Sequence, residues 1–177
     1  HHMKNAVFII PKPSLLVEAV NTIDEIFVIM EKDAEQGQNF QDIQGDVYEF
    51  LLSEIASAGK NGQFRTPRHI IKLLAELVQP QLGHTVCDPA CGTGGFLACS
   101  IDLLKTQIKT AEDQKVFQTS VSGIEKKQLP HLLCTTNMML HGIEVPQQIR
   151  QGNTLKRPLS SIEASEMVDV IVTNPPF

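Results

Sequence analysis

A glycine-rich stretch, Asp88–Phe96, constrains what this chain can fold into more than any other feature of its sequence. It reads DPACGTGGF and follows Thr85-Val86-Cys87, which predicts a short buried strand. Apolar residues then recur at helical spacing, at Leu97, Ala98, Ile101 and Leu104. Because glycine has no Cβ, such a turn lets the backbone approach a ligand closely. The stretch therefore predicts a ligand site at the carboxyl end of a strand in a parallel α/β sheet.

The glycine pattern argues against one common class of ligand, the dinucleotides. Their fingerprint is G-x-G-x-x-G, and this chain offers Gly92 and Gly94 but has Leu97 at the third position. Asp88, ahead of the glycines, would also repel a pyrophosphate. A carboxylate at this place suits a cofactor that carries an ammonium and a sulfonium group, and S-adenosylmethionine (SAM) carries both.

Composition bounds the class of protein. The 177 residues suffice for one domain with a proper core and a small helical appendage. His1 and His2, ahead of Met3, are interpreted as a tag remnant and excluded. We find no apolar run of membrane-spanning length and no signal-peptide pattern after Met3, so we expect a cytoplasmic protein without a membrane partner.

Cysteines and charge narrow the function further. The four cysteines form no C-x-x-C pair and have no matching histidine cluster, which predicts buried, reduced thiols and no metal site. The net charge is −5, whereas proteins that hold DNA alone usually present a basic face. If this chain works on DNA, another subunit or further residues must supply much of the grip.

Two helices are expected before the glycine stretch. The first follows Pro13, with Ser14 as N-cap, and the second runs from about Ile43 to Ala58. The inward face of the second helix is predicted to hold Val47, Phe50, Leu51 and Ile55. These helices could dock on partner subunits or cover the sheet, and the sequence favours neither role over the other.

A third helix is expected to begin at Thr66 and Pro67, with threonine as the cap and proline in the first turn. Its predicted buried face consists of Ile70, Ile71, Leu74, Leu77 and Val78.

Strands and helices should alternate after the glycine stretch. Residues 110–118 are expected to be a polar connection, and 121–124 a second strand that ends at Glu125, where a carboxylate can accept two hydrogen bonds from ribose hydroxyls. A helix over 128–140 follows, with His131 and His141 expected as surface or capping residues. A β-branched strand over 168–172 then leads into Asn174-Pro175-Pro176-Phe177. This alternation predicts a doubly-wound parallel sheet.

Three motifs together resemble one known family. Asp88–Phe96 resembles the SAM-binding motif of amino-methyltransferases, and Asn174–Phe177 resembles their catalytic motif. With Gly62–Arg68 upstream, residues 41–177 resemble the modification (methylation) subunit of type I restriction–modification systems, which are DNA adenine-N6 methyltransferases. The resemblance implies a Rossmann-like SAM-dependent methyltransferase fold. We therefore expect a helical N-terminal segment over 3–60 and a SAM-binding domain over 61–177 that is incomplete at its C-terminus.

The resemblance also implies a cofactor site. Its residues, carried over position by position, are Gln63, Phe64, Thr66, Pro67, Arg68, Asp88, Pro89, Ala90, Gly92, Thr93, Gly94, Gly95, Phe96, Glu125 and Asn153. Those from Gln63 to Arg68 are expected to line the methionine end of SAM. At Asn153 the family usually has aspartate, so this chain would offer the adenine of SAM an uncharged acceptor.

Catalysis is expected at Asn174, Pro175 and Phe177. The adenine amine is a poor nucleophile because its lone pair is delocalised into the ring. The Asn174 side-chain oxygen and the Pro175 carbonyl could accept its N–H bonds and localise that pair. Phe177 could stack on the flipped base, worth roughly 1–3 kcal/mol, against a few kcal/mol for extracting it from the duplex.

The implied partners are double-stranded DNA with a flipped adenine, a specificity subunit, a second modification subunit and a restriction subunit. Two alternatives stay open. The chain could be a SAM-binding assembly module that is inactive by itself, or it could methylate another amine, in protein glutamine or in RNA. The position of Gln63–Arg68 ahead of the glycine stretch favours the type I subunit.

Overall fold

The structure is a computed structural model that describes residues 12–35, 40–57 and 65–176. The chain divides into two compact units, His1–Ile43 and Gln44–Phe177. The boundary expected at residue 60 lies outside the described residues, so it stays a prediction. Within the described ranges, no helix has both the length and the apolar character needed to cross a membrane.

The first unit holds α1, which spans Pro13–Glu35. The helix expected there is confirmed, but it begins one residue before Ser14, the predicted cap. Proline fits the first turn of a helix because its missing N–H would have no intrahelical partner there. The Leu15 N–H donates to the carbonyl of Lys12, at 3.1 Å, which closes this first turn.

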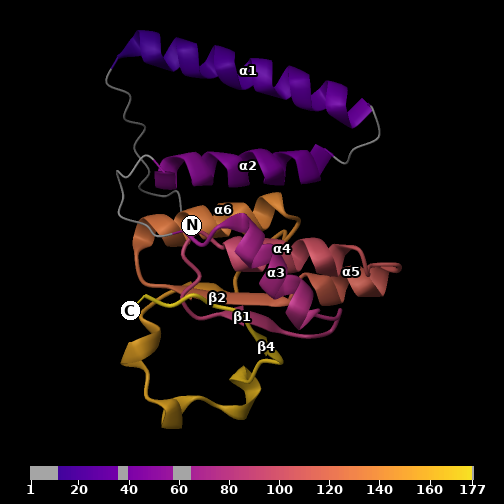
Figure 1. Ribbon diagram of the computed structural model, residues 1–177, viewed down its shortest axis with the longest axis vertical. Helices are drawn as coiled ribbons and strands as arrows, with labels where there is room; N and C mark the ends of the chain where they lie inside the picture. Colours follow the sequence, from indigo (N-terminus) through magenta and orange to yellow (C-terminus); the bar gives the residue numbers. More distant parts are fainter. Residues whose placement is uncertain (1–11, 36–39, 58–64, 177) are drawn as a thin grey trace. The chain divides into compact units, whose positions relative to one another are not determined.

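The second unit is built on a parallel sheet, as the sequence predicts. Its four described strands lie in the order β3-β2-β1-β4, with bounds β1 Val86–Asp88, β2 Val121–Glu125, β3 Ile149–Gln151 and β4 Val170–Ile171. Val86 pairs with Val121 on one side and with Val170 on the other (Figure 1). The strand order therefore reverses at β1, and such a switch point is where open parallel sheets bind ligands.

Helices connect and cover these strands. Their bounds are α2 Phe40–Ser57, α3 Arg68–Val78, α4 Gly95–Lys105, α5 Ala111–Phe117 and α6 Gln128–Leu140. Three short 3₁₀ turns, Thr154–Lys156, Leu159–Ser161 and Ala164–Glu166, lie between β3 and β4. Helix α4 packs on β1 and β2, α6 packs on β2 and β3, and α4 also contacts α6, so both cover the same face of the sheet (Figure 1).

The core lies between this sheet face and α4 and α6. Its most completely buried apolar side chains are Val86, Leu97, Ile101, Leu104, Phe117, Val121, Cys134, Met138 and Ile143. The helical spacing of apolar residues that predicts α4 is confirmed, because Leu97, Ala98, Ile101 and Leu104 are all buried. All four cysteines are free thiols, as expected, but only Cys91 and Cys134 are buried, whereas Cys87 and Cys99 are partly exposed.

The polar connection expected over residues 110–118 contains a helix, α5. The Thr110 hydroxyl accepts from the Asp113 N–H at 3.1 Å, and the Asp113 carboxylate accepts from the Thr110 N–H at 2.9 Å. This reciprocal capping box satisfies N–H groups that a helix otherwise leaves unpaired. It allows a polar segment to be helical, with Phe117 alone fully buried.

Helix α3 was predicted correctly as an element but wrongly in its buried face. Only Ile71 and Ala75 are buried, whereas Leu77 is 71% exposed and Ile70, Leu74 and Val78 are also exposed. A strongly amphipathic sequence identifies a helical face, but the neighbours that cover it decide how much of that face is buried.

The buried face of α2 also differs from the prediction. Gly45, Glu49 and Leu52 are buried, whereas Phe50 and Leu51 are exposed. Within the second unit α2 packs on α6: the Tyr48 hydroxyl donates to the carbonyl of Leu133 at 3.2 Å. A Cβ added at Gly45 would lie 2.9 Å from Nε2 of His141, so glycine permits this close approach.

The two histidines of α6 are not surface residues. His131 and His141 are 9% and 4% exposed, respectively. Nε2 of His131 lies 3.0 Å from the Ile149 carbonyl, and Nδ1 of His141 lies 3.0 Å from Asp102 Oδ1. His141 does cap the end of α6, as one of the two expected roles requires. Each imidazole has a polar partner at one ring nitrogen, which offsets part of the cost of burial, whereas Nε2 of His141 has none among the described residues.

Candidate cofactor and base site

The glycine stretch forms a tight turn from β1 into α4. Gly92 and Gly94 have φ angles of +54° and +86°, in the left-handed region that side chains with a Cβ avoid. The Gly94 N–H donates to the Cys91 carbonyl at 2.7 Å, and Gly94 is the N-cap of α4. A Cβ at Gly94 would lie 2.7 Å from Cys134 Sγ, so both backbone and packing require glycine there.

Asp88 ends β1 and lies under this turn. Its side chain is 1% exposed, and its Oδ1 accepts from the Ala90 N–H at 3.0 Å. Burial raises the pKa of this carboxyl to about 6, although the Thr173 hydroxyl and the Ala90 N–H act in the opposite direction. The nearby charge of Glu125 raises the pKa further. A buried carboxylate with a raised pKa is costly without a cation beside it, which makes Asp88 a candidate ligand group.

Glu125 lies at the same edge of the sheet, at the end of β2. Its Oε2 accepts from the Gly92 N–H at 3.0 Å, and its Oε1 accepts from the Lys127 N–H at 2.7 Å. Parallel pairing places Asp88 opposite Gly123, two residues before Glu125. Each oxygen of a carboxylate has two lone pairs, so both remain able to accept a ligand hydroxyl.

Asn153 follows β3 and is anchored beside the same turn. Its Oδ1 accepts from the Leu155 N–H at 3.1 Å and caps the turn Thr154–Lys156. The Thr154 hydroxyl donates to the Pro89 carbonyl at 2.6 Å, and the Gly152 N–H donates to the Glu125 carbonyl at 2.9 Å. The three strand ends are thus tied to one another by hydrogen bonds.

Asn174 joins the site from β4. The Val172 N–H donates to the Cys87 carbonyl at 3.0 Å, which keeps the segment after β4 beside β1. The Asn174 Nδ2 donates to the Thr66 hydroxyl at 3.0 Å, across 108 positions of sequence. Asn174, Pro175 and Pro176 are exposed, so the turn is open to a ligand on this side.

Of the two roles predicted for Thr66, that of helix cap is wrong. It does not cap α3: the N-cap is Pro67, whose carbonyl accepts from the N–H groups of Ile70 and Ile71 at 3.0 and 3.2 Å. Threonine before proline is a helix-start signal, but its hydroxyl is used by Asn174 instead. Proline restricts the preceding residue to extended geometry, which carries the Thr66 side chain away from the helix axis.

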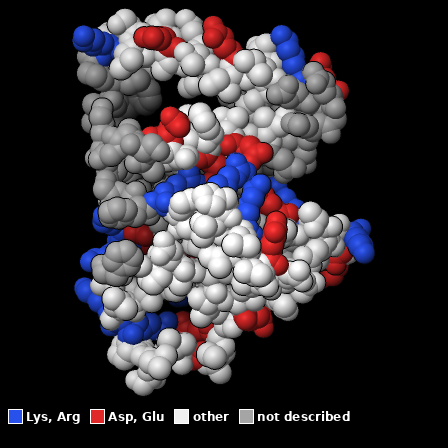
Figure 2. Space-filling view, in the orientation of Figure 1, with Lys and Arg blue, Asp and Glu red and all other residues white. Residues whose placement is uncertain are grey.

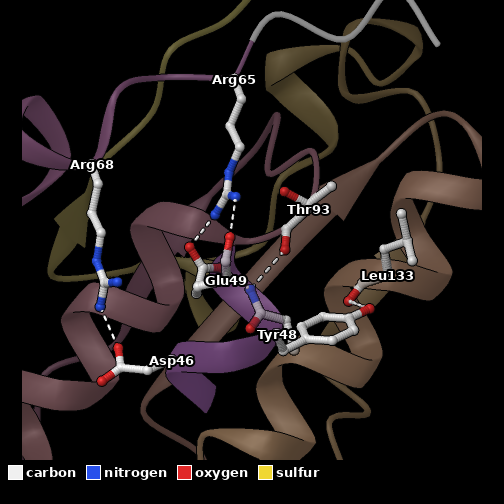
Figure 3. Close-up of polar contacts among 8 residues, drawn as sticks. Asp46, Tyr48, Glu49, Arg65, Arg68, Thr93 and Leu133 are labelled. Atoms are coloured by element: carbon white, nitrogen blue, oxygen red, sulfur yellow. Dashed lines mark hydrogen bonds and ion pairs between the residues drawn. The ribbon is translucent and has the colours of Figure 1, made fainter. Parts of the chain in front are cut away.

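The remaining predicted residues lie in three places: the turn with the start of α4, the start of α3, and positions outside the described residues. Pro89, Ala90, Thr93, Gly95 and Phe96 belong to the turn and the start of α4, and Phe96 is buried. The Arg68 guanidinium pairs with Asp46 of α2, and both side chains are more than half exposed (Figure 3). Gln63, Phe64 and Phe177 lie outside the described residues.

Sequence reasoning missed three residues that contact the turn or its neighbours. Glu49 of α2 accepts from Arg65 Nη2 (Figure 3). It also accepts from Asn137 Nδ2 of α6, at 2.6 Å. Asn137 also donates to the Thr93 carbonyl, at 3.0 Å. No sequence signal marks Glu49, because a charged residue on a helix is normally assigned to solvent.

A family model described as N-6 DNA Methylase matches residues 39–177. This chain belongs to the N-6 DNA methylase family. The match covers both the glycine turn and Asn174, the two features that the fold brings to one edge of the sheet.

The chain is also similar to methylase subunits of type I restriction enzymes. The chain is 50% identical over 178 residues to the EcoEI methylase subunit of a type I restriction enzyme of Escherichia coli, a match that covers 100% of this chain and 33% of that protein. It is 37% identical over 145 residues to the EcoKI methylase subunit of E. coli K12, covering 75% of this chain and 27% of that protein. The chain therefore spans about a third of the length of these relatives.

Solved structures of type I restriction enzyme subunits share the fold. The modification subunit of a candidate type I restriction enzyme from Vibrio vulnificus YJ016 superposes with a TM-score of 0.68 at 45% identity, over 75% of this chain and 28% of that one. The M protein of the type I enzyme EcoKI superposes with a TM-score of 0.56 at 30% identity, over 67% of this chain and 26% of that one. The predicted α/β methyltransferase fold is confirmed.

Glycine turn: Gly94→Ala should destabilise the fold more than the matched variant Gly92→Ala. Both substitutions force alanine into a left-handed backbone, at about 1–2 kcal/mol each. Gly94→Ala alone adds a clash with Cys134 and Met138, for roughly 1–3 kcal/mol more. Urea unfolding followed by circular dichroism measures the difference. Equal losses for the two variants would contradict the packing role of Gly94.

Asp88→Asn should stabilise the protein at neutral pH. The folded-state pKa of Asp88 is raised from 3.8 to about 6, so the folded protein binds this proton more tightly than the unfolded chain. The parent therefore loses stability as the pH rises from 3.8 to 6, by up to about 3 kcal/mol, and the loss persists above pH 6. The variant should match the parent near pH 4 and exceed it at pH 7. Urea unfolding at both pH values tests this, and a gain of the same size at pH 4 would refute it.

Proposed function

We propose that this chain contributes the cofactor and base sites of a type I DNA adenine-N6 methyltransferase that uses SAM. The observation that carries the proposal is the hydrogen bond between Asn174 and Thr66, which fixes the Asn174 amide at the sheet edge shared with Asp88 and Glu125. The chain spans about a third of its curated relatives, so the activity concerns the subunit to which these residues contribute.

Asn174 is suited to hold an amine. Its Nδ2 donates to Thr66, so its Oδ1 is the atom left to accept an N–H from a base. The carbonyl of Pro175 can accept the second N–H. Two acceptors would draw the adenine amine toward tetrahedral geometry and localise its lone pair for attack. Phe177, which lies outside the described residues, would stack on the flipped base.

The residues around the glycine turn fit SAM. The Asp88 carboxylate would neutralise the cationic methionine part, and Glu125 would accept hydrogen bonds from the ribose hydroxyls. Asn153 would contact the adenine of SAM through the second lone pair of its Oδ1. When bound, SAM supplies an electrophilic methyl group. The chain's residues then act by placing the amine in line with it, and alignment carries most of the rate.

The charge of the chain supports a role for partner subunits in holding DNA. Its net charge is −5, and on the face shown in Figure 2 the basic side chains lie among acidic ones. Phosphate contacts supply most non-specific affinity, so we propose that a specificity subunit, a second modification subunit and further residues hold the duplex. A restriction subunit would complete the assembly, and the complex would work in the cytoplasm.

Asn174→Ala should abolish methyl transfer but spare SAM binding. The expected loss of rate is about 10²-fold or more, because the reacting amine loses its alignment. Thr66→Val keeps the shape of Thr66 but removes the acceptor for Asn174, and should cost about tenfold. Labelled SAM is incubated with the chain, a type I specificity subunit and separate pools of DNA, RNA and protein.

Each outcome of this assay separates the alternatives. Label in DNA adenine that Asn174→Ala abolishes supports the proposal. SAM binding without transfer to any pool selects an assembly module, and label in RNA or protein alone selects another amine.

SAM affinity should depend on the ionisation of Asp88. Below pH 6 the carboxyl becomes protonated and loses its attraction for the cationic cofactor. Affinity should therefore fall as the pH drops from 7 to 5, by up to about tenfold per pH unit below the pKa. Calorimetric titration of the parent beside Asp88→Asn measures this. The variant should bind more weakly and without this pH dependence, and two parallel profiles would remove Asp88 from the site.

A further inference from the structure

A buried carboxylate on α2 joins the two halves of the proposed site. Glu49 is 7% exposed and lies at the centre of a group of polar side chains (Figure 3). Its Oε1 accepts from Asn137, and its Oε2 pairs with Arg65. The Arg65 Nη1 also donates to the backbone carbonyl of Glu49, at 2.8 Å. Glu49 thus accepts three hydrogen bonds, two from Arg65 before α3 and one from Asn137 of α6.

One branch of this network reaches the glycine turn. Asn137 is fully buried in α6, and its Nδ2 donates both to Glu49 Oε1 at 2.6 Å and to the Thr93 carbonyl at 3.0 Å. Thr93 lies between the two left-handed glycines, Gly92 and Gly94. The position of Glu49 therefore fixes a carbonyl in the middle of the turn that would hold the cofactor.

The other branch reaches the base site. Arg65 is the residue before Thr66, whose hydroxyl accepts from Asn174. Two hydrogen bonds to one residue fix a guanidinium in both position and orientation. The Glu49–Arg65 pair therefore restrains the backbone that carries the acceptor for the Asn174 amide.

A contribution to folding stability does not by itself explain this network, because burying charged and polar groups costs free energy. Replacing a buried ion pair by apolar side chains is often neutral or stabilising. Asn137 Oδ1 is buried without a hydrogen-bond partner among the described residues, which adds a desolvation cost. The Arg65 guanidinium also lies near the first residue of α4, 3.8 Å from a Cβ placed on Gly95, where the helix dipole disfavours a cation.

We infer that Glu49 is a positioning residue, which sets the glycine turn through Asn137 and Asn174 through Arg65 and Thr66. The inference rests on the proposed function and deepens it. Glu49 touches neither cofactor nor base: it makes the geometry of one site depend on that of the other. Helix α2, which carries Glu49, thereby helps to position the residues of the proposed site.

The test uses three variants in the assembled enzyme. Asn137→Ala breaks the branch to the turn, Arg65→Lys weakens the branch to Asn174, and Glu49→Gln removes the charge on which both depend. The measurements are the Kd for SAM, and kcat and KM for DNA methylation, each well below the melting midpoint of the variant. Glu54→Gln is the matched control, because Glu54 is an exposed residue of the same helix.

We expect the two single-branch variants to change different constants, one mainly the Kd for SAM and the other mainly kcat. Asn137→Ala should raise the Kd for SAM about tenfold with a smaller change in kcat, and Arg65→Lys should lower kcat about tenfold with a smaller change in Kd. Glu49→Gln should change both constants, and Glu54→Gln neither. A purely structural role predicts lower melting midpoints with unchanged Kd and kcat, which would overturn the inference.

The design keeps two failures apart. A folded parent that neither binds SAM nor methylates DNA overturns the proposed function, and the inference with it. A parent that does both, while Asn137→Ala and Arg65→Lys match it, overturns the role of Glu49 alone. If Glu49→Gln does not fold, the two single-branch variants decide the question, since each leaves the other branch intact.

Discussion

The pairing of β1 on both of its edges is the constraint on which the rest of the second unit depends. Val86 lies in register with Val121 on one side and with Val170 on the other, so the chain after β1 and the chain after β4 emerge at the same edge of the sheet. Because the strands are parallel, Asp88 and Asn174 meet there although 86 positions separate them in the sequence. The turn after β1 can follow this geometry only because Gly92 and Gly94 accept left-handed backbone angles.

Polar side chains extend this geometry beyond the sheet. Glu125 and Thr154 hydrogen-bond to the glycine turn from β2 and from the segment after β3, while Asn137 reaches it from α6. Glu49 then connects α6 to the segment before α3. Most of these groups are buried or half-buried, where each hydrogen bond is stronger than in water and each unpaired group costs more. These hydrogen bonds restrain the glycine turn and the segments around it.

Several features could be predicted from the sequence because they depend on local chemistry. The glycine turn, the parallel strands, the acidic ends of β1 and β2 and the helix α4 all follow from residue type and spacing. The errors at Thr66 and at the buried polar residues have a different cause. Thr66 carries a helix-start signal, but a residue 108 positions away takes its hydroxyl. His131 and His141 were expected as surface or capping residues, and Glu49 was not predicted at all, yet partners from other elements make the burial of all three possible.

The sequence by itself determined the class of fold and indicated the residues that we propose to bind a cofactor and an amine, because glycine freedom, apolar periodicity and side-chain chemistry are local properties. Only the tertiary structure decided which of those residues meet. It turned Thr66 toward Asn174, directed Arg68 to Asp46, and enclosed Glu49 between Arg65 and Asn137. Contacts of this kind depend on which surfaces pack together, and side chains at distant positions settle that jointly through burial and hydrogen bonding.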